Sequence, residues 1–178
     1  MTSKEAGLTL MELLIALAVA AILTGVAYPS YQAAVGKVRI TDSQRRLQES
    51  ITASMRYALR TRRNVVMCPS LDGSSCVRGS DWSSGWISFV DLDRDRERSP
   101  EEPLVGSPAK PAERIRVTSN TGRPRIAFRA NGTNPGSNAT FTICDPGSRA
   151  AAAALIIANS GQLRRSSSGT NLRCEQTH

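Results

Sequence analysis

The chain has 178 residues, a formal net charge of +8 and only 4% aromatic residues. This length accommodates a membrane segment and one domain of about 120 residues with a modest core. The few aromatic residues argue against a stacking platform for single-stranded nucleic acid. The single His, at position 178, and the lack of a C-x-x-C pair argue against a zinc site.

An apolar run over residues 8–28 dominates the N-terminal part. As a helix it rises about 1.5 Å per residue, enough to cross the roughly 30 Å apolar core of a bilayer. One charged residue, Glu12, interrupts the run. A carboxylate in hydrocarbon costs about 2.5–3.5 kcal/mol on insertion scales, so we expect a partner to neutralise it. The run itself contains no basic side chain, so the partner is expected from proteolysis or from another subunit.

A short polar leader, residues 1–7 (MTSKEAG), precedes this run and ends in Gly7. Leader and run together resemble the class III signal of type IV pilins and type II secretion pseudopilins. The resemblance implies that a prepilin peptidase cuts after Gly7 and methylates the new amine on Leu8, where the family usually has Phe. It also implies that Glu12 neutralises the terminal amine of a neighbouring subunit during filament assembly.

Two alternatives to a prepilin signal remain. One is an ordinary secretory signal, because residues 16–18 and 18–20 both read Ala-x-Ala. The other is a plain membrane-anchored periplasmic domain. Against a secretory signal, Lys4 is offset by Glu5, so the leader has no positive n-region, and an acidic residue inside the apolar region is unusual.

Helical periodicity continues beyond Pro29, which we expect to kink the helix without ending it. Spacings of three, four or their multiples predict an amphipathic helix over residues 30–63, with these apolar positions on one face: Val35, Val38, Leu47, Ile51, Met55, Ala58 and Leu59. The expected organisation is a leader at 1–7, a transmembrane or filament-core helix at 8–29, the amphipathic helix at 30–63 and a periplasmic β-rich head at 64–178.

Beyond Arg63, short β-rich runs alternate with segments rich in Gly, Pro, Ser and Asn. We expect strands at residues 65–68, 86–91, 114–118, 125–129, 140–144, 155–158 and 163–165. A long helix followed by strands predicts an α+β fold, with the helix covering one face of an antiparallel sheet. Residues 94–111 carry many charges and are expected to form an exposed loop.

The chain has four cysteines, and three pairings of them are possible. We favour Cys68–Cys76, which closes a short loop, together with Cys144–Cys174, which fastens the C-terminal tail. Disulfides indicate an oxidising compartment, here the periplasm.

Residues 91–95 (DLDRD) resemble the start of a calcium loop, and Glu102 occupies the twelfth position from Asp91. The sixth position should be Gly, but here it is Arg96. Positions 94, 96 and 98 are also all Arg, which repels a cation, so we favour a mixed-charge hairpin tip and expect no metal. Trp82 and Trp86 could form a sugar or partner platform. We expect instead that they anchor a loop and begin a strand in the core.

Four segments of the head are similar to the pseudopilin H / FimT family of minor pilins: residues 66–76 (VMCPSLDGSSC), 82–91 (WSSGWISFVD), 140–145 (TFTICD) and 158–161 (ANSG). With the leader and the apolar run, the resemblance extends over nearly the whole chain. It implies a structural subunit of a type IV pilus or a type II secretion pseudopilus.

Arginines provide most of the positive charge and cluster in the second half of the chain. We expect several side chains of one group to share a solvent face: Arg114, Arg116, Arg123, Arg125 and Arg129. The candidate DNA-binding residues lie further on: Arg149, Arg164, Arg165 and Arg173. Such clusters neutralise DNA phosphates without reading sequence, or are simply a solvated face.

The FimT branch of the family includes DNA-binding pilins of natural transformation with a Gly-Arg-x-Arg motif. This chain has Gly161 and Arg164 at the matching positions, but Gln162 replaces the first arginine, and Arg165 is the candidate to compensate. Double-stranded DNA uptake is therefore the alternative function.

No base accompanies the serines, and the cysteines are expected to be paired, so we expect no enzyme and no cofactor. The expected location is the bacterial inner membrane, with a single pass, a cytoplasmic N-terminus and a periplasmic head. The expected partners are other minor and major pilins or pseudopilins, the prepilin peptidase and the inner-membrane assembly platform.

Overall fold

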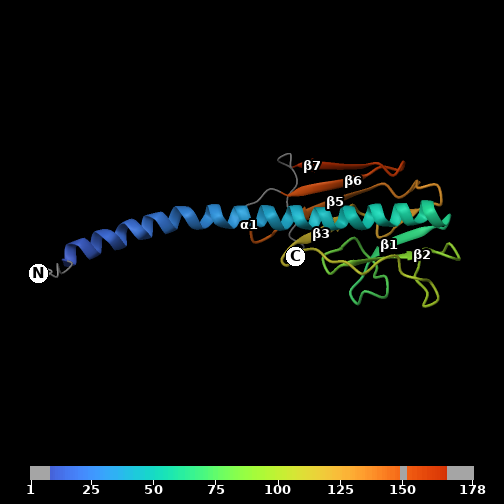
Figure 1. Ribbon diagram of the computed structural model, residues 1–178, viewed down its shortest axis with the longest axis horizontal. Helices are drawn as coiled ribbons and strands as arrows, with labels where there is room; N and C mark the ends of the chain where they lie inside the picture. The colour runs from blue at the N-terminus through green and yellow to red at the C-terminus, as the bar shows by residue number, and fades with distance from the viewer. Residues whose placement is uncertain (1–8, 149–151, 168–178) are drawn as a thin grey trace, which may run out of the picture.

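A single long helix carries a head of β-strands (Figure 1). The computed structural model describes residues 9–148 and 152–167. In this part of the chain, helix α1 (Leu10–Thr61) is followed by strands β1 (Val65–Pro69), β2 (Trp86–Val90), β3 (Arg116–Ser119), β4 (Ile126–Phe128), β5 (Ala139–Cys144), β6 (Ala153–Ile157) and β7 (Leu163–Ser167). The expected α+β fold of a long helix on an antiparallel β-rich head is confirmed.

Helix α1 has a defined start and end. It begins after Thr9, whose Oγ1 accepts the backbone N–H of Glu12 at 3.3 Å, an N-cap bond. It ends at Arg62, which adopts a left-handed conformation with φ 57°. Pro29 lies inside the helix without ending it, and Figure 1 shows a gradual bend over the blue N-terminal half.

The strands form two sheets, where the sequence predicted one. The first sheet has the order β2-β1-β4 and the second the order β3-β5-β6-β7, and every pair is antiparallel. Helix α1 packs against β1 and β4 of the first sheet and against β5 and β6 of the second. The C-terminal half of the helix therefore joins the two sheets (Figure 1).

The buried stripe of α1 differs from the apolar face expected from sequence. It contains Gly36, Ile40, Ser43, Gln44, Leu47, Ile51, Ser54 and Ala58. Val38 is 68% exposed and Leu59 is 46% exposed, so both expectations were wrong. Val38 stands two residues from both Gly36 and Ile40, which places it on the opposite side of a helix with 3.6 residues per turn.

Both tryptophans lie in the core, as expected. Trp82 is fully buried and meets Phe141 edge to face, with ring centroids 5.1 Å apart. Its Nε1 donates to Ser119 Oγ at 3.1 Å, and Trp86 Nε1 donates to Ser50 Oγ of the helix at 2.9 Å. Each indole N–H thus has a partner despite burial.

A disulfide joins Cys68 to Cys76 and closes the loop after β1. In the loop-entropy model, a bridge over so short a loop contributes about 2–3 kcal/mol. Asp72 inside the loop accepts the backbone N–H groups of Ser74 and Ser75, and these bonds hold the pKa of its carboxyl well below the usual range. Cys144 is also disulfide-bonded, while Cys174, its expected partner, lies outside the described residues.

Candidate functional site

The N-terminal half of α1 is an apolar stalk, residues 10–28, that extends beyond the head (Figure 1). Every residue of the stalk is exposed, including the consecutive Leu13, Leu14 and Ile15, so the apolar surface runs around the whole circumference. Of the described segments, α1 alone is long and apolar enough to cross a membrane. A helix that is apolar on all sides needs a cover of lipid or of other helices.

Glu12 is the acidic residue of this stalk and lies in the first turn of α1. A carboxylate is favourable there because the helix macrodipole is positive at its N-terminus. That interaction alone does not neutralise a full charge once lipid or helices cover the stalk. Gly7 and Leu8, the expected processing residues, lie outside the described part of the chain.

The second half of α1 is fastened to the head by polar bonds inside the buried stripe. Gln44 Nε2 donates to the carbonyl of Ala154 at 2.9 Å, deep in the interior. Ser43 Oγ accepts the backbone N–H of Ala112 at 2.9 Å. An apolar pattern alone does not include Gln44 and Ser43 in the buried face of the helix, because both are polar. Their helical spacing with Ile40, Leu47 and Ile51 is the sequence signal that places them on this face.

Additional bonds fix the helix on both sheets. Ser54 Oγ donates to Ser88 Oγ of β2 at 2.8 Å. Arg165 Nε of β7 donates to Gln48 Oε1 at 2.7 Å. Because the contacts reach strands of both sheets, the second half of α1 has a fixed position on the head.

Arg164 and Arg165 occupy β7, which lies at the edge of the second sheet. Consecutive residues of a strand point to opposite faces. Since Arg165 contacts Gln48 of the helix, Arg164 points to the other face and is exposed. The structure therefore does not bring the two candidate DNA-binding residues together, and Arg149 and Arg173 lie outside the described residues.

The backbone conformation at position 161 explains why the Gly-x-x-Arg segment begins with glycine. Gly161 has φ 85°, and a Cβ at this position would lie 2.8 Å from the carbonyl oxygen of Gly132. Its N–H donates to the carbonyl of Ala158 at 2.8 Å in the turn between β6 and β7. The turn itself accounts for glycine here, so Gly161 is no evidence for DNA binding.

Two of the five arginines expected to share one solvent face, Arg123 and Arg125, have local partners instead. Arg125 is ion-paired with Glu97, donates to the carbonyl of Arg96 at 2.7 Å, and keeps only 10% of its side chain exposed. Arg123 Nε donates to the carbonyl of Asn138 at 3.1 Å. These two side chains hold neighbouring loops in place, which corrects the expectation for Arg123 and Arg125.

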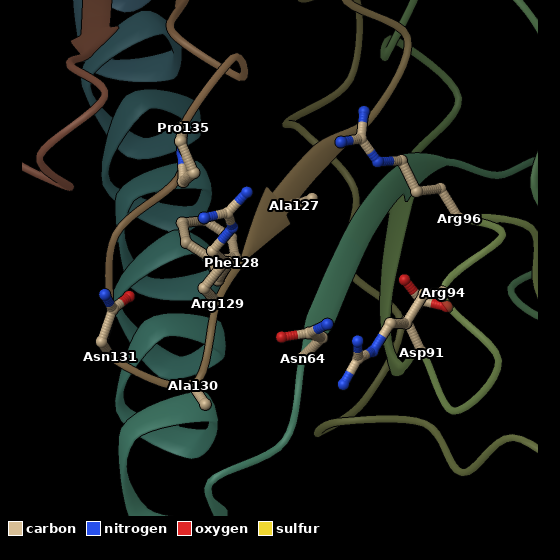
Figure 2. Close-up of a pocket in the computed structure, with 10 residues that line it drawn as sticks. All are labelled: Asn64, Asp91, Arg94, Arg96, Ala127, Phe128, Arg129, Ala130, Asn131 and Pro135. Atoms are coloured by element: carbon tan, nitrogen blue, oxygen red, sulfur yellow. The ribbon is translucent and has the colours of Figure 1, made fainter.

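An open pocket of about 540 Å³ lies between the loop after β2 and the segment after β4 (Figure 2). Figure 2 shows Asn64 between the two walls, with Asp91, Arg94 and Arg96 on one side and Arg129 and Asn131 on the other. The remaining lining residues are Ala127, Phe128, Ala130 and Pro135. Most of the residues that line the pocket are polar or charged.

Three carboxylates lie close together in the loop after β2, at the side of the pocket that contains Asp91. Asp91, Asp93 and Asp95 each offer an oxygen, and these oxygens lie within 4.8 Å of one another. Burial raises the pKa of the Asp91 carboxyl, the backbone amides of Arg96 and Arg94 oppose this shift, and the charges of Glu102 and Asp93 add to it. Oxygen groups of this kind are ligands for hard cations.

Comparison with known proteins connects this architecture to a family. The family model described as "Type II transport protein GspH" matches residues 43–161. The model described as "Prokaryotic N-terminal methylation motif" matches residues 2–28. No curated protein matches the chain significantly.

Two solved structures resemble the fold, both of the type IV minor pilin FimU from Pseudomonas aeruginosa, in two crystal forms. The first has a TM-score of 0.55 and 19% identity, and the match covers 72% of this chain and 88% of FimU. The second has a TM-score of 0.50 and 18% identity, and covers 71% of this chain and 91% of FimU. At these identities the likeness establishes the fold alone.

Proposed function

Because the chain belongs to the GspH family of type II transport proteins, we propose that it is a minor pilin or pseudopilin subunit of a type IV pilus or a type II secretion pseudopilus. The observation that carries the proposal is the apolar stalk: it is exposed on every side and continues into the half of α1 that packs on a folded head. Lipid covers the stalk before assembly, and helices of other subunits cover it in the filament. The proposed role is structural, without an enzyme activity or a cofactor.

Processing precedes assembly in this proposal. The prepilin peptidase removes residues 1–7 after Gly7 and methylates the amine of Leu8. Residues 8–29 then span the inner membrane with the N-terminus in the cytoplasm, while residues 64–178 form the periplasmic head on the helix of residues 30–63. The match of residues 2–28 to the N-terminal methylation motif supports this sequence of events.

Glu12 has a direct role in assembly in this proposal. The amine released by cleavage belongs to one subunit and the Glu12 carboxylate to its neighbour, so the two charges neutralise each other inside an apolar filament core. Extraction of the subunit from the membrane by the assembly platform is favoured when that pair forms. Other minor and major pilins or pseudopilins are therefore the direct partners.

We expect mass spectrometry of the chain purified from bacterial membranes to find N-methylated Leu8 as the first residue. Replacing Gly7 with Asp should leave the leader attached, because the peptidase loses the small residue at its cleavage site. The variant Ser3→Ala, changed in the same leader, is the control and should be processed normally. A retained Met1 in the wild type, or a cut within residues 16–20, contradicts the proposal.

DNA binding is the second candidate function, favoured by the exposed Arg164 on an edge strand of a chain with net charge +8. Such binding would fall linearly with the logarithm of salt concentration. If it occurs, Arg164→Ala should reduce the salt slope by about 1, as expected for one lost phosphate contact. Arg165→Ala should change the slope less, because Gln48 already engages that guanidinium.

The measurement is duplex-DNA fluorescence anisotropy with the full chain in neutral detergent micelles, over a series of salt concentrations. Absence of binding at low salt would reject DNA uptake and leave the structural role. Equal effects of the two substitutions would contradict the assignment of the contact to Arg164.

A further inference from the structure

We propose that the loop after β2 binds one calcium ion through the carboxylates of Asp91, Asp93 and Asp95. The proposal goes beyond the role as a filament subunit and does not rest on it. It also reverses the expectation, drawn from the sequence, of a mixed-charge loop without a metal.

The three carboxylates form a compact set of oxygen ligands. One oxygen of each lies within 4.8 Å of the others. Asp93 Oδ1 accepts the N–H of Asp95 at 3.2 Å, and Asp95 Oδ1 accepts the N–H of Glu97 at 2.6 Å. Three negative charges at this separation repel one another unless a cation lies among them.

An independent observation concerns Asp91 itself. The residue is only 6% exposed, and its Oδ1 is buried without a hydrogen-bond partner. Buried polar atoms are nearly always paired, and a buried charge is costly unless its partners compensate for the lost water. The backbone amides of Arg96 and Arg94 favour the charged form of this carboxyl, but its Oδ1 atom stays unpaired. In the described part of the chain, no ion pair neutralises this carboxylate. A bound cation supplies the missing partner.

The loop has the spacing of a calcium loop, with aspartates at its first, third and fifth positions. The sixth position of such loops is Gly because the chain turns sharply there. Here Arg96 occupies it with φ 64°, so the backbone has the required left-handed conformation although the residue is not Gly. The missing glycine at the sixth position is therefore no obstacle to a calcium loop here.

Glu102, at the twelfth position, closes the loop. It is 2% exposed; its Oε1 accepts the N–H of Leu92 at 2.7 Å and its Oε2 accepts the N–H of Ser99 at 3.0 Å. These bonds hold both ends of the loop together, which corrects the expectation that residues 94–111 are exposed throughout. Glu102 is thus a positioning residue for the three aspartates.

The neighbouring arginines leave the site accessible to a cation. Arg98 donates to the carbonyl of Ser74, and Arg125 pairs with Glu97. In Figure 2 the guanidinium of Arg96 points away from Asp91. Arg94 lies beside Asp91 in the wall of the pocket, and its positive charge weakens the site without occupying it.

Calcium fits this loop better than magnesium. Calcium accepts six to eight oxygen ligands in a flexible arrangement, whereas magnesium demands near-ideal octahedral geometry and keeps most of its waters. Three carboxylates beside an arginine place the expected dissociation constant at about 10⁻⁴–10⁻³ M, the range of extracellular calcium modules.

The test uses the full chain in neutral detergent micelles, after removal of metal with a chelator. Calcium is titrated in, binding is measured by isothermal titration calorimetry, and stability is measured by thermal unfolding. We expect one site per chain and a midpoint of unfolding that rises by about 3 °C or more at 10 mM calcium. Magnesium at the same concentration should shift the midpoint less.

Asp93→Asn and Asp95→Asn should each weaken calcium binding about tenfold or more, because each removes a charged ligand at an exposed position where folding is not at risk. Glu101→Gln is the matched control: it removes one negative charge from the same exposed loop and should bind calcium as the wild type does. Arg94→Gln should strengthen binding.

Three results would overturn the proposal. The first is that calcium gives the wild type neither a binding heat nor a shift of the unfolding midpoint. The second is that Glu101→Gln and Asp93→Asn weaken calcium binding equally, which would indicate general charge screening. The third is that magnesium shifts the unfolding midpoint as much as calcium does. None of them bears on filament assembly, which depends on the stalk.

Discussion

Glu12→Gln should reduce incorporation of the chain into filaments by about 100-fold or more. The substitution keeps the size of the side chain but removes its charge, so the amine of the neighbouring subunit stays unpaired in an apolar core. Breaking a buried ion pair by removing one partner costs about 3–5 kcal/mol, and each 1.4 kcal/mol corresponds to a factor of ten. The measurement is quantitative mass spectrometry of sheared filaments against the membrane-bound pool.

Glu49→Gln is the control for this prediction. Glu49 also lies on α1 and pairs with Arg45 at 2.8 Å, but both side chains are largely exposed, and such pairs contribute little. The control should assemble normally. Normal assembly of Glu12→Gln as well would contradict the pairing of Glu12 with an amine.

Phe141→Ala should lower the free energy of unfolding of the head by about 3–5 kcal/mol. Phe141 is fully buried and contacts Trp82, so the substitution leaves a cavity and removes an edge-to-face contact. Small domains are stable by about 5–15 kcal/mol, so this loss is a large part of the total. Urea unfolding of the full chain in micelles, followed by Trp fluorescence, gives the value.

Phe141→Leu is the matched variant, since it keeps most of the apolar volume at this position. We expect it to cost no more than about 1.5 kcal/mol. A loss below 1 kcal/mol for Phe141→Ala would show that the interior around Trp82 is not closely packed.

The helix and the strands could be predicted because their signals are local. Short windows of sequence contain all of these signals: the apolar run, the helical spacing beyond Pro29, and the alternation of β-rich runs with turn residues. The division into two sheets was not predictable in this way, because β1 pairs with β4 and β3 with β5 across long connections. Those pairings depend on the packing of the whole head.

The structure differs from the sequence-based expectations at the two candidate DNA-binding arginines and at the loop after β2, for different reasons. Arg164 and Arg165 are neighbours in an expected strand, where consecutive side chains face opposite ways, so their separation follows from the sequence alone. From the sequence, Arg96 argues against a calcium loop, because the left-handed backbone that it adopts is rare for residues other than Gly. That conformation depends on tertiary contacts such as the bond from Arg125 to the Arg96 carbonyl.

The most direct test of the assembly account is zero-length carbodiimide cross-linking of purified filaments, followed by peptide mass spectrometry. The account predicts an amide that joins the Glu12 carboxyl to the N-terminal amine of another subunit, because only groups in contact react. Cross-links elsewhere in the filament, with Glu12 found only in unlinked peptides, would contradict it.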